Sequence, residues 1–557
     1  VYGIFLTEDE LEALRVEHAE EMAKNGTSAH GQMAEQAKAF RPEVGIHEFA
    51  NSGGGGRVYG RDRDEELAHL DGNPRLAEAG LVLKDADTLR MAARYALSLA
   101  MSEHWESGFM SDVPGCPWED RAFRRSYVCD DIARVLDLAG EMFTDTGRLY
   151  LMRRLAEEGA GPINFVTWRH EYIFHCNQLA FFNAGRMAAY VVMERQWPRV
   201  KPYTDLAYED TVNNLNNVIE PDGGYLEGPG YFNPTIRENY DVLKYYARAR
   251  GRNAQELIPE AVKRTPDFAA VVASTTEEDA IPICDSGSEF GFSTLEILSN
   301  LLPDSYWVTV YNKKARAEGR EPLPKEGPPL PHFVALAVTG HLASLRDLDG
   351  QPVKILVMGH KAGADHTHED KGSFVLEFAG QAFAMDPGMC EYDDPIHHEY
   401  KQCQRHNMLA PVGTAERARP LRPLPVSVRP SGTGDATSFQ ASIDATPGWE
   451  PFYRKWVRTW DSPTADVLTI HDEYELASGD GVEFYWQTKL PCQQEGNTVV
   501  IVGERGKATV TVPEGCTVRI ETLPLAEGDE QRRIAIGKAG VKGALTVRVA
   551  LEATAAP

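Results

Sequence analysis

Through the first 320 residues, apolar side chains recur three and four positions apart. This spacing places them on one face of a helix, with polar residues on the opposite face. Thr7 and Glu10 have the spacing of a capping box, and Gly251 stands where a helix-ending glycine is expected. The clearest helical segments are residues 6–24, 84–105, 127–143, 176–197 and 238–251. The pattern predicts a helical domain over residues 1–320.

Two stretches between these helices, residues 220–234 and 281–294, lack a helical period and contain several aromatic residues. They are too long to be simple turns, and long loops on a rigid scaffold often carry functional residues. We expect them to be functional loops.

Beyond residue 333 the apolar period changes to two, which is typical of strands. Residues 321–333 are rich in proline, whose missing N–H disfavours both a helix and a central strand. We therefore expect a linker at 321–333 and an antiparallel β-sheet domain at 334–557. The expected strands cover residues 353–359, 373–380, 382–386, 467–476, 482–490, 498–503, 508–512, 516–523 and 545–553.

The formal charge of −26, from 57 basic and 83 acidic residues, disfavours nucleic acid and anionic membranes as partners. No apolar run approaches the ~20 residues of a membrane helix. An acidic protein can still bind an anionic polymer where basic residues are concentrated, because salt screens charges beyond about 8 Å. The eight cysteines form no CxxC pair, so neither a zinc ribbon nor a disulfide scaffold is expected.

Metal-binding residue types gather between positions 366 and 406. His366, His368 and Asp370 alternate just before an expected strand, so an extended backbone would point all three to one side. Asp386 ends the following hairpin, and His406 lies 20 residues further on. Imidazoles with a carboxylate are a normal ligand set for zinc, and manganese is a competitor. The alternative is that these are surface histidines or histidines satisfied within the core.

The sequence HTHEDKGSFVLEFAGQAFAMDPG, followed by RHNML, resembles the signature of the heparinase II/III-like polysaccharide lyases. NQLAFFNAGRMAAYVV and DGGYLEGPGYFNP resemble that family's toroid helix and the loop after it. The resemblance is close over residues 165–415. It implies an α+β multidomain fold, with an incomplete (α/α) toroid followed by an antiparallel β-sandwich or sheet domain.

The same resemblance assigns roles to individual residues. It implies that Tyr231 is the catalytic tyrosine, that His366 is the base and that Asn177 neutralises the substrate carboxylate. His175 and Gln178 flank Asn177, and either is a candidate to share the carboxylate site. The implied metal ligands are His368, Asp386 and His406. We expect the ion, Zn or Mn, to be structural, and we expect no organic cofactor.

Other residues are candidates for substrate contacts. Arg124, Arg169 and Arg237 are basic side chains that could meet carboxylates or sulfates, although a solvated helix face is the alternative for each. Tyr400, six residues before His406, is a candidate second tyrosine because some alginate-cleaving relatives use one from this region.

The implied reaction, β-elimination, explains these residue types. The C5 proton of a uronic acid becomes removable once the adjacent carboxylate is neutralised, and an acid must protonate the departing O4. For a glucuronate, we expect His366 to abstract the proton and Tyr231 to donate one. For an iduronate, Tyr231 could do both.

The expected protein is therefore a polysaccharide lyase that acts on an anionic uronic-acid polysaccharide and leaves a 4,5-unsaturated product. A glycosaminoglycan such as hyaluronan, chondroitin or heparan sulfate is the first expectation, and alginate or another polyuronate is the second. A uronate C5 epimerase, a non-catalytic carbohydrate-binding protein and a metal-dependent hydrolase are the alternatives. We expect a secreted or periplasmic bacterial protein whose signal peptide is absent from this chain, and the oligomeric state is left open.

Overall fold

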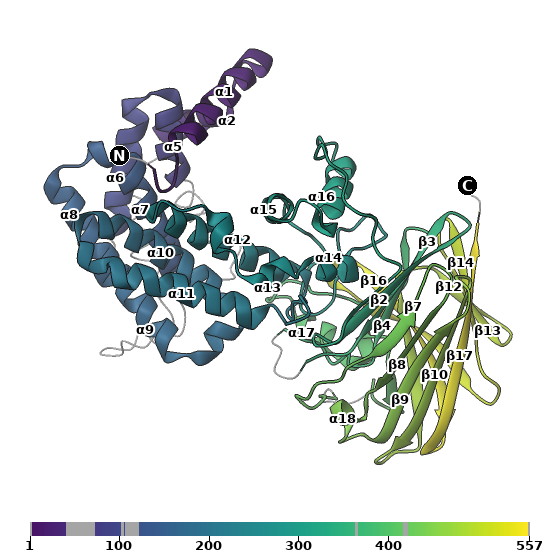
Figure 1. Cartoon of the computed structure of the whole chain (residues 1–557). Coiled ribbons are helices and arrows are strands. Elements are labelled where there is room, and N and C mark those ends of the chain that lie inside the picture. Colours follow the sequence, from purple (N-terminus) through teal and green to yellow (C-terminus); the bar gives the residue numbers. More distant parts are fainter. Residues whose placement is uncertain are drawn as a thin grey trace. The chain divides into compact units, whose positions relative to one another are not determined.

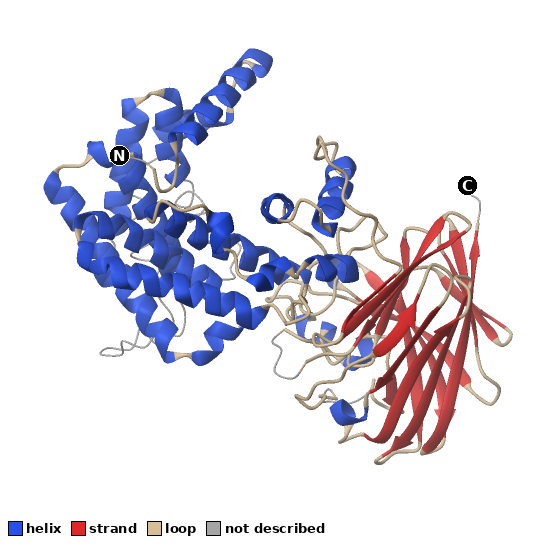
Figure 2. Ribbon diagram, in the orientation of Figure 1, coloured by secondary structure: helices blue, strands red, loops and turns tan. Residues whose placement is uncertain are grey.

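The computed structural model describes residues 3–39, 73–101, 105, 122–361, 366–415 and 421–554. The chain divides into two compact units, one of residues 1–217 and 234–259 and the other of residues 218–233 and 260–557 (Figure 1). Among the described residues, the first unit is helical, while the strands belong to the second unit (Figure 2). None of the described helices has the length and apolar character required to cross a membrane.

The first unit is built around one buried helix, α10, which lies against α7. Gly185 allows the close approach, because a Cβ at this position would lie 2.0 Å from the carbonyl oxygen of Ser126 on α7. Thr7 and Glu10 form the expected capping box. The helices of this unit are α1 (Glu8–Asn25), α2 (Ala29–Ala39), α5 (Asn73–Leu83), α6 (Ala86–Met101), α7 (Phe123–Leu138), α8 (Asp145–Arg154), α9 (Gly161–Arg169), α10 (Gln178–Gln196), α11 (Lys201–Val218) and α12 (Pro229–Ala249).

Helix α12 begins earlier than the sequence pattern indicates. The expected loop over 220–234 ends at Gly228, and Pro229 opens the helix, where its missing N–H is tolerated. Tyr231 therefore lies on the first turn of α12. The residues up to 233 belong to the second unit, and those from 234 belong to the first.

The second unit combines six α-helices with three antiparallel sheets among the described residues. The sheet orders are β1-β2-β3-β4-β5, β12-β13-β14-β17-β10-β9-β8-β7 and β15-β16-β11-β6. Side chains from all three sheets share one core, which includes Phe374, Trp456 and Trp486. Four of these helices are α13 (Glu260–Lys263), α14 (Pro266–Val272), α15 (Phe292–Leu301) and α16 (Tyr306–Ala317).

The strands that form these sheets are β1 (Phe333–Leu336), β2 (His341–Leu348), β3 (Gln351–Met358), β4 (Phe374–Phe378), β5 (Gln381–Ala384), β6 (Leu409–Pro411), β7 (Ser431–Gly434), β8 (Phe439–Asp444), β9 (Tyr453–Ser462), β10 (Val467–Leu476), β11 (Gly481–Thr488), β12 (Cys492–Glu495), β13 (Thr498–Val502), β14 (Gly506–Thr511), β15 (Thr517–Pro524), β16 (Glu530–Ala539) and β17 (Lys542–Ala553). Two further short helices, α17 (His397–Tyr400) and α18 (Thr446–Trp449), lie in connections between strands.

Helix α14 packs on the five-stranded sheet through buried polar groups. Lys354 on β3 pairs in register with Glu377 on β4. The Lys354 ammonium donates to the carbonyls of Ala270 and Ala273, and Glu377 accepts from the Ser274 hydroxyl at 2.6 Å. Burial lowers the pKa of Lys354 to about 8.

The predicted order of helices followed by antiparallel sheets is confirmed. Residues 321–332 contain no helix or strand. The compact units nevertheless group α13–α16 with the sheets. The boundaries at 320 and 334 thus mark a change of secondary structure, and a separation into domains at these positions stays a prediction.

Candidate functional site

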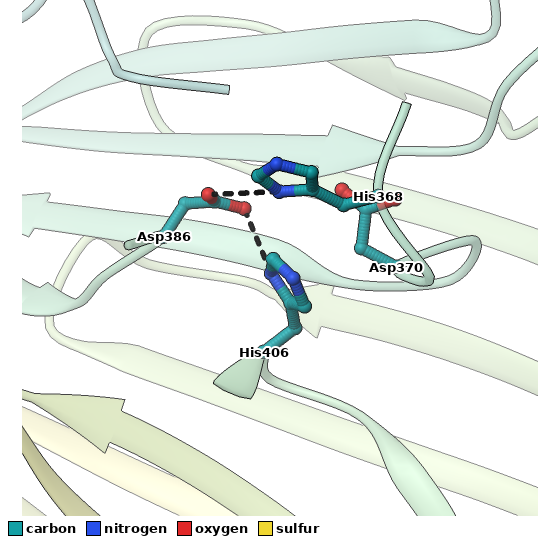
Figure 3. A group of neighbouring side chains, drawn as sticks. All are labelled: His368, Asp370, Asp386 and His406. Carbon is teal, nitrogen blue, oxygen red and sulfur yellow. Dashed lines mark hydrogen bonds and ion pairs between the residues drawn. The ribbon is translucent and has the colours of Figure 1, made fainter. Parts of the chain in front are cut away.

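Four buried side chains converge in the second unit: His368, Asp370, Asp386 and His406 (Figure 3). One ligand atom from each lies within 4.8 Å of the others. His368 and Asp370 come from the turn before β4, Asp386 follows β5, and His406 follows the short helix Cys403–Arg405. The three predicted metal ligands are therefore brought together, with Asp370 as a fourth member of the cluster.

The hydrogen bonding within this cluster is incomplete. His406 Nδ1 lies 3.0 Å from one oxygen of Asp386, and His368 Nδ1 lies 3.8 Å from the other. Among the described residues, both ring nitrogens of His368, Nε2 of His406 and one oxygen of Asp370 have no hydrogen-bond partner. Buried polar atoms without partners are costly, and a divalent cation would satisfy them. Two imidazoles and two carboxylates fit zinc, and manganese is also compatible.

Two further features support this fit. Burial lowers the pKa of His368 well below its ordinary value, so its imidazole is neutral, which is the form that ligates metal. The other oxygen of Asp370 lies 2.8 Å from Nε2 of the buried His360. A histidine behind a ligating carboxylate is a common outer-sphere arrangement. The sequence pattern did not single out His360.

His366 has different neighbours from those of the metal-binding cluster. The segment from 366 to 373 is a turn rather than extended backbone, so the expected alternation does not place His366 in the cluster. The imidazole of His366 stacks on the ring of Tyr231, with centroids 4.1 Å apart and planes 21° apart. Its Nδ1 lies 3.1 Å from a carboxylate oxygen of Glu227. The two residues predicted as base and catalytic tyrosine are thus in direct contact within one unit.

Tyr392 is the second tyrosine at this site. Its hydroxyl meets that of Tyr231 and donates to a carboxylate oxygen of Asp285 at 3.2 Å. Lys401 lies 2.6 Å from the same carboxylate oxygen. Burial, followed by the hydrogen bond with Tyr231, raises the pKa of Tyr392 well above its ordinary value, so its hydroxyl stays protonated.

Tyr400, the candidate second tyrosine from the sequence, belongs to the same unit and has other partners than Tyr392. Its hydroxyl accepts a hydrogen bond from the Ala526 amide at 2.8 Å. It packs with Met385, Cys390 and Leu525. The sequence analysis named Tyr400 and did not single out Tyr392, although both lie in one short segment, because residue spacing does not tell which side chain contacts Tyr231.

Comparison with known proteins identifies one domain of this chain. Residues 335–546 match the family described as heparinase II/III-like, C-terminal. The chain carries a heparinase II/III-like C-terminal domain. The heparinase II/III-like resemblance expected from the sequence motifs is confirmed over these residues. No curated protein sequence matches the chain.

Solved structures share the fold of the helical region together with that of the heparinase II/III-like domain. A heparinase III, the BT4657 gene product, is 14% identical with a TM-score of 0.68, over 94% of this chain and 84% of that one. A mutant of the heparan sulfate lyase HepC from Pedobacter heparinus is 14% identical, with a TM-score of 0.64 over 98% and 88%. A mutant chondroitin AC lyase from Streptomyces coelicolor A3 is 10% identical, with a TM-score of 0.50 over 97% and 82%. The toroid-and-sheet fold is confirmed, and family and fold together indicate a polysaccharide lyase.

Several predicted site residues lie in the helical unit rather than in the heparinase II/III-like domain. His175 ends a short 3-10 helix, Asn177 is buried, and Gln178 is the first residue of α10. The Tyr172 hydroxyl donates to the Gln178 side chain at 3.4 Å. Phe165, half exposed on α9, joins Tyr172 in presenting an aromatic ring to solvent. These residues have the polar and aromatic character of a sugar-binding surface.

The three predicted arginines have distinct surroundings. Arg169 ends α9, with its guanidinium 5.7 Å from the Phe165 ring centroid. Arg237 on α12 pairs with the neighbouring Glu238 at 2.7 Å. Arg124 is half-buried in the first turn of α7. Their roles in substrate binding stay predictions.

Proposed function

We propose that the protein cleaves uronic-acid-containing glycosaminoglycans by β-elimination. The observation that carries this proposal is the stacked pair of Tyr231 and His366, at 4.1 Å, in a chain with a heparinase II/III-like domain. One residue can remove a proton while the other supplies one, which is the pair of transfers that elimination requires.

In the proposed reaction, the C5–H and C4–O4 bonds break and a C4–C5 double bond forms. For a glucuronate, His366 takes the C5 proton and Tyr231 gives its hydroxyl proton to O4. For an iduronate, Tyr231 performs both transfers. Asn177 is proposed to hydrogen-bond the substrate carboxylate and stabilise the negative charge that develops on it.

We also propose that His368, Asp370, Asp386 and His406 hold a divalent ion, zinc or manganese. The ion would hold the turn that carries His366, which makes its role structural. The support is the set of buried ligand atoms without protein partners among the described residues.

The proposed substrate is a glycosaminoglycan, namely hyaluronan, chondroitin sulfate or heparan sulfate. The fold shared with heparinase III and with a chondroitin AC lyase supports this class. Arg124, Arg169 and Arg237 are proposed contacts for its anionic groups. Such substrates are extracellular, so we propose a secreted or periplasmic location.

The test is to incubate the protein separately with hyaluronan, chondroitin sulfate, heparan sulfate and alginate and to measure absorbance at the unsaturated-uronate band. A rise on a glycosaminoglycan supports the proposal, and a rise on alginate alone reassigns the substrate. A changed uronate composition without a rise indicates a C5 epimerase. New reducing ends without a rise indicate a hydrolase.

A further inference from the structure

Glu227 is a buried carboxylate beside the proposed base. Only 3% of its surface is exposed, and one of its oxygens lies 3.1 Å from His366 Nδ1. The backbone next to Glu227 is closely packed. At Gly228, where φ is +86°, a Cβ would lie 2.5 Å from the carbonyl oxygen of Ile283. The carboxylate is therefore presented from a backbone with little room to shift.

The backbone and the ring of His366 are also held. Its φ of +55° lies in the left-handed region, which is unfavourable for a residue other than glycine. Its carbonyl accepts a hydrogen bond from the Asp285 amide at 2.8 Å, and its ring stacks on Tyr231. Strained backbone of this kind persists where surrounding contacts impose it, and the contacts here fix how the ring faces Glu227.

We infer that Glu227 is a positioning residue that fixes the tautomer of His366. An ionised carboxylate only accepts hydrogen bonds, so Nδ1 must carry the proton. In a neutral imidazole the lone pair is then on Nε2, the nitrogen left to act as base. The tautomer assignment rests on the 3.1 Å contact between Nδ1 and the Glu227 carboxylate. The catalytic consequence rests on the proposed function, in which His366 takes the C5 proton.

The test compares Glu227→Gln with Glu220→Gln in the full, metal-loaded chain. Glu220 is a matched control, because it is a buried carboxylate of the same segment and receives Lys361 at 2.7 and 2.8 Å. The first readout is the ¹⁵N spectrum of His366, assigned by its loss in His366→Gln. We expect the Nδ1–H tautomer in the unsubstituted chain and in Glu220→Gln. We expect Nε2–H, or a mixture, in Glu227→Gln, because its amide can donate to Nδ1.

The second readout is steady-state kinetics on the glucuronate polymer that gives an unsaturated product. Glu227→Gln should lower kcat by roughly 10²- to 10⁴-fold with KM within about threefold, as expected for a base held in the wrong tautomer. Glu227→Asp retains a carboxylate and should recover part of the loss. Glu220→Gln should change kcat by less than about threefold.

The inference is overturned if His366 carries its proton on Nε2 in the unsubstituted chain. It is also overturned if Glu227→Gln changes neither the tautomer nor kcat. The spectrum of the unsubstituted chain decides the tautomer even if the variant folds poorly. If no polymer yields an unsaturated product, the proposed function fails, and the spectrum still decides the role of Glu227.

Discussion

Tyr231 contacts two other proposed or neighbouring site residues, one through its ring and one through its hydroxyl. Its ring lies on His366, and its hydroxyl meets Tyr392, which in turn donates to Asp285. With the Tyr392 proton directed to Asp285, the Tyr392 oxygen can accept from Tyr231. The Tyr231 hydroxyl is therefore oriented by neighbours before any substrate arrives, which reduces the reorganisation needed in the reaction.

Replacing Tyr231 by Phe tests the acid directly. The variant keeps the ring that stacks on His366 and removes only the hydroxyl. We expect the rate of unsaturated-product formation to fall by at least about 10²-fold, the contribution typical of a positioned acid or base. The melting temperature should stay close to that of the parent chain. A near-normal rate in a folded variant would remove Tyr231 from the mechanism.

Tyr392→Phe and Tyr400→Phe together show which tyrosine assists Tyr231. We expect Tyr392→Phe to lower kcat by about tenfold or more, because Tyr231 loses its acceptor. Tyr400→Phe should act mainly on stability, by about 1 kcal/mol, because the Ala526 amide loses its partner. Initial rates and urea unfolding measure the two effects. The opposite ranking of the rates would assign the role to Tyr400.

Site residues gathered by local chain geometry could be predicted from the sequence, whereas those gathered by tertiary packing could not. His368 and Asp386 flank one hairpin, and His406 follows within 20 residues of Asp386, so local chain geometry gathers them. Glu227, Asp285 and Tyr392 reach Tyr231 and His366 from three separate connections. Their placement depends on tertiary packing, which residue spacing does not contain. Glu227 lies inside a recognised motif, but the motif does not indicate that its carboxylate contacts His366.

At the scale of helices, the approach of α7 and α10 depends on Gly185. Gly185→Ala should lower the free energy of unfolding by about 1–3 kcal/mol, because its Cβ would meet the Ser126 backbone. Gly140→Ala is the matched control, since a Cβ there meets nothing within 4 Å. Urea unfolding followed by circular dichroism measures both. Equal stabilities of the two variants would contradict close packing at Gly185.

The contact of β3 with α14 predicts a pH dependence of stability. The pKa of Lys354 is about 8 in the folded chain and near 10.5 when exposed, so between these values the unfolded state binds more protons. Stability from this group therefore rises with pH from about 8 to 10.5, by a few kcal/mol at most. Lys354→Met should remove this rise. Unfolding curves of both proteins across this range measure it, and parallel curves would refute it.

Helices and strands were predictable to different degrees. The helical segments and the strands near residues 353–386 and 467–476 follow clear apolar periods. Strands β1, β2, β6, β7, β8, β9, β12 and β16 were not predicted. In β9, charged residues and bulky aromatic side chains interrupt the alternation. Arg458 on β9 shows why, since it is fully buried and held by Asp472 in the core at 2.7 Å. In the sequence of a single strand, a charged residue that is buried in an ion pair cannot be distinguished from a charged residue at the surface.

For the whole molecule, the metal-binding cluster predicts that stability depends on metal. Removing a bound divalent ion should lower the melting temperature of the second unit by several degrees, because ligand binding adds to the free energy of folding. Readdition of zinc or manganese should restore the transition. Calorimetry with elemental analysis measures this, and His406→Ala is the matched variant. An unchanged transition, with no metal in the purified protein, would contradict the site.

The grouping of helices with the sheets was the feature least accessible from the sequence. The sequence places a boundary where helices give way to strands, but packing assigns residues 218–233 and α13–α16 to the unit that contains the sheets. Apolar periods reveal which face of a helix is buried. They do not reveal which neighbour covers it.

Residues 218–233 precede the strands in sequence but belong to the second unit, and this limits which segments of the protein can be transferred to another chain. A gene fusion that transferred only residues 335–546 would carry the histidines and aspartates of the metal-binding cluster but would leave Tyr231 and Glu227 behind. Such a segment would keep His366, the proposed base, and the metal ligands, but it would lack the proposed acid and the carboxylate that positions His366. We therefore expect a transferred gene segment to retain lyase activity only if it begins upstream of residue 218.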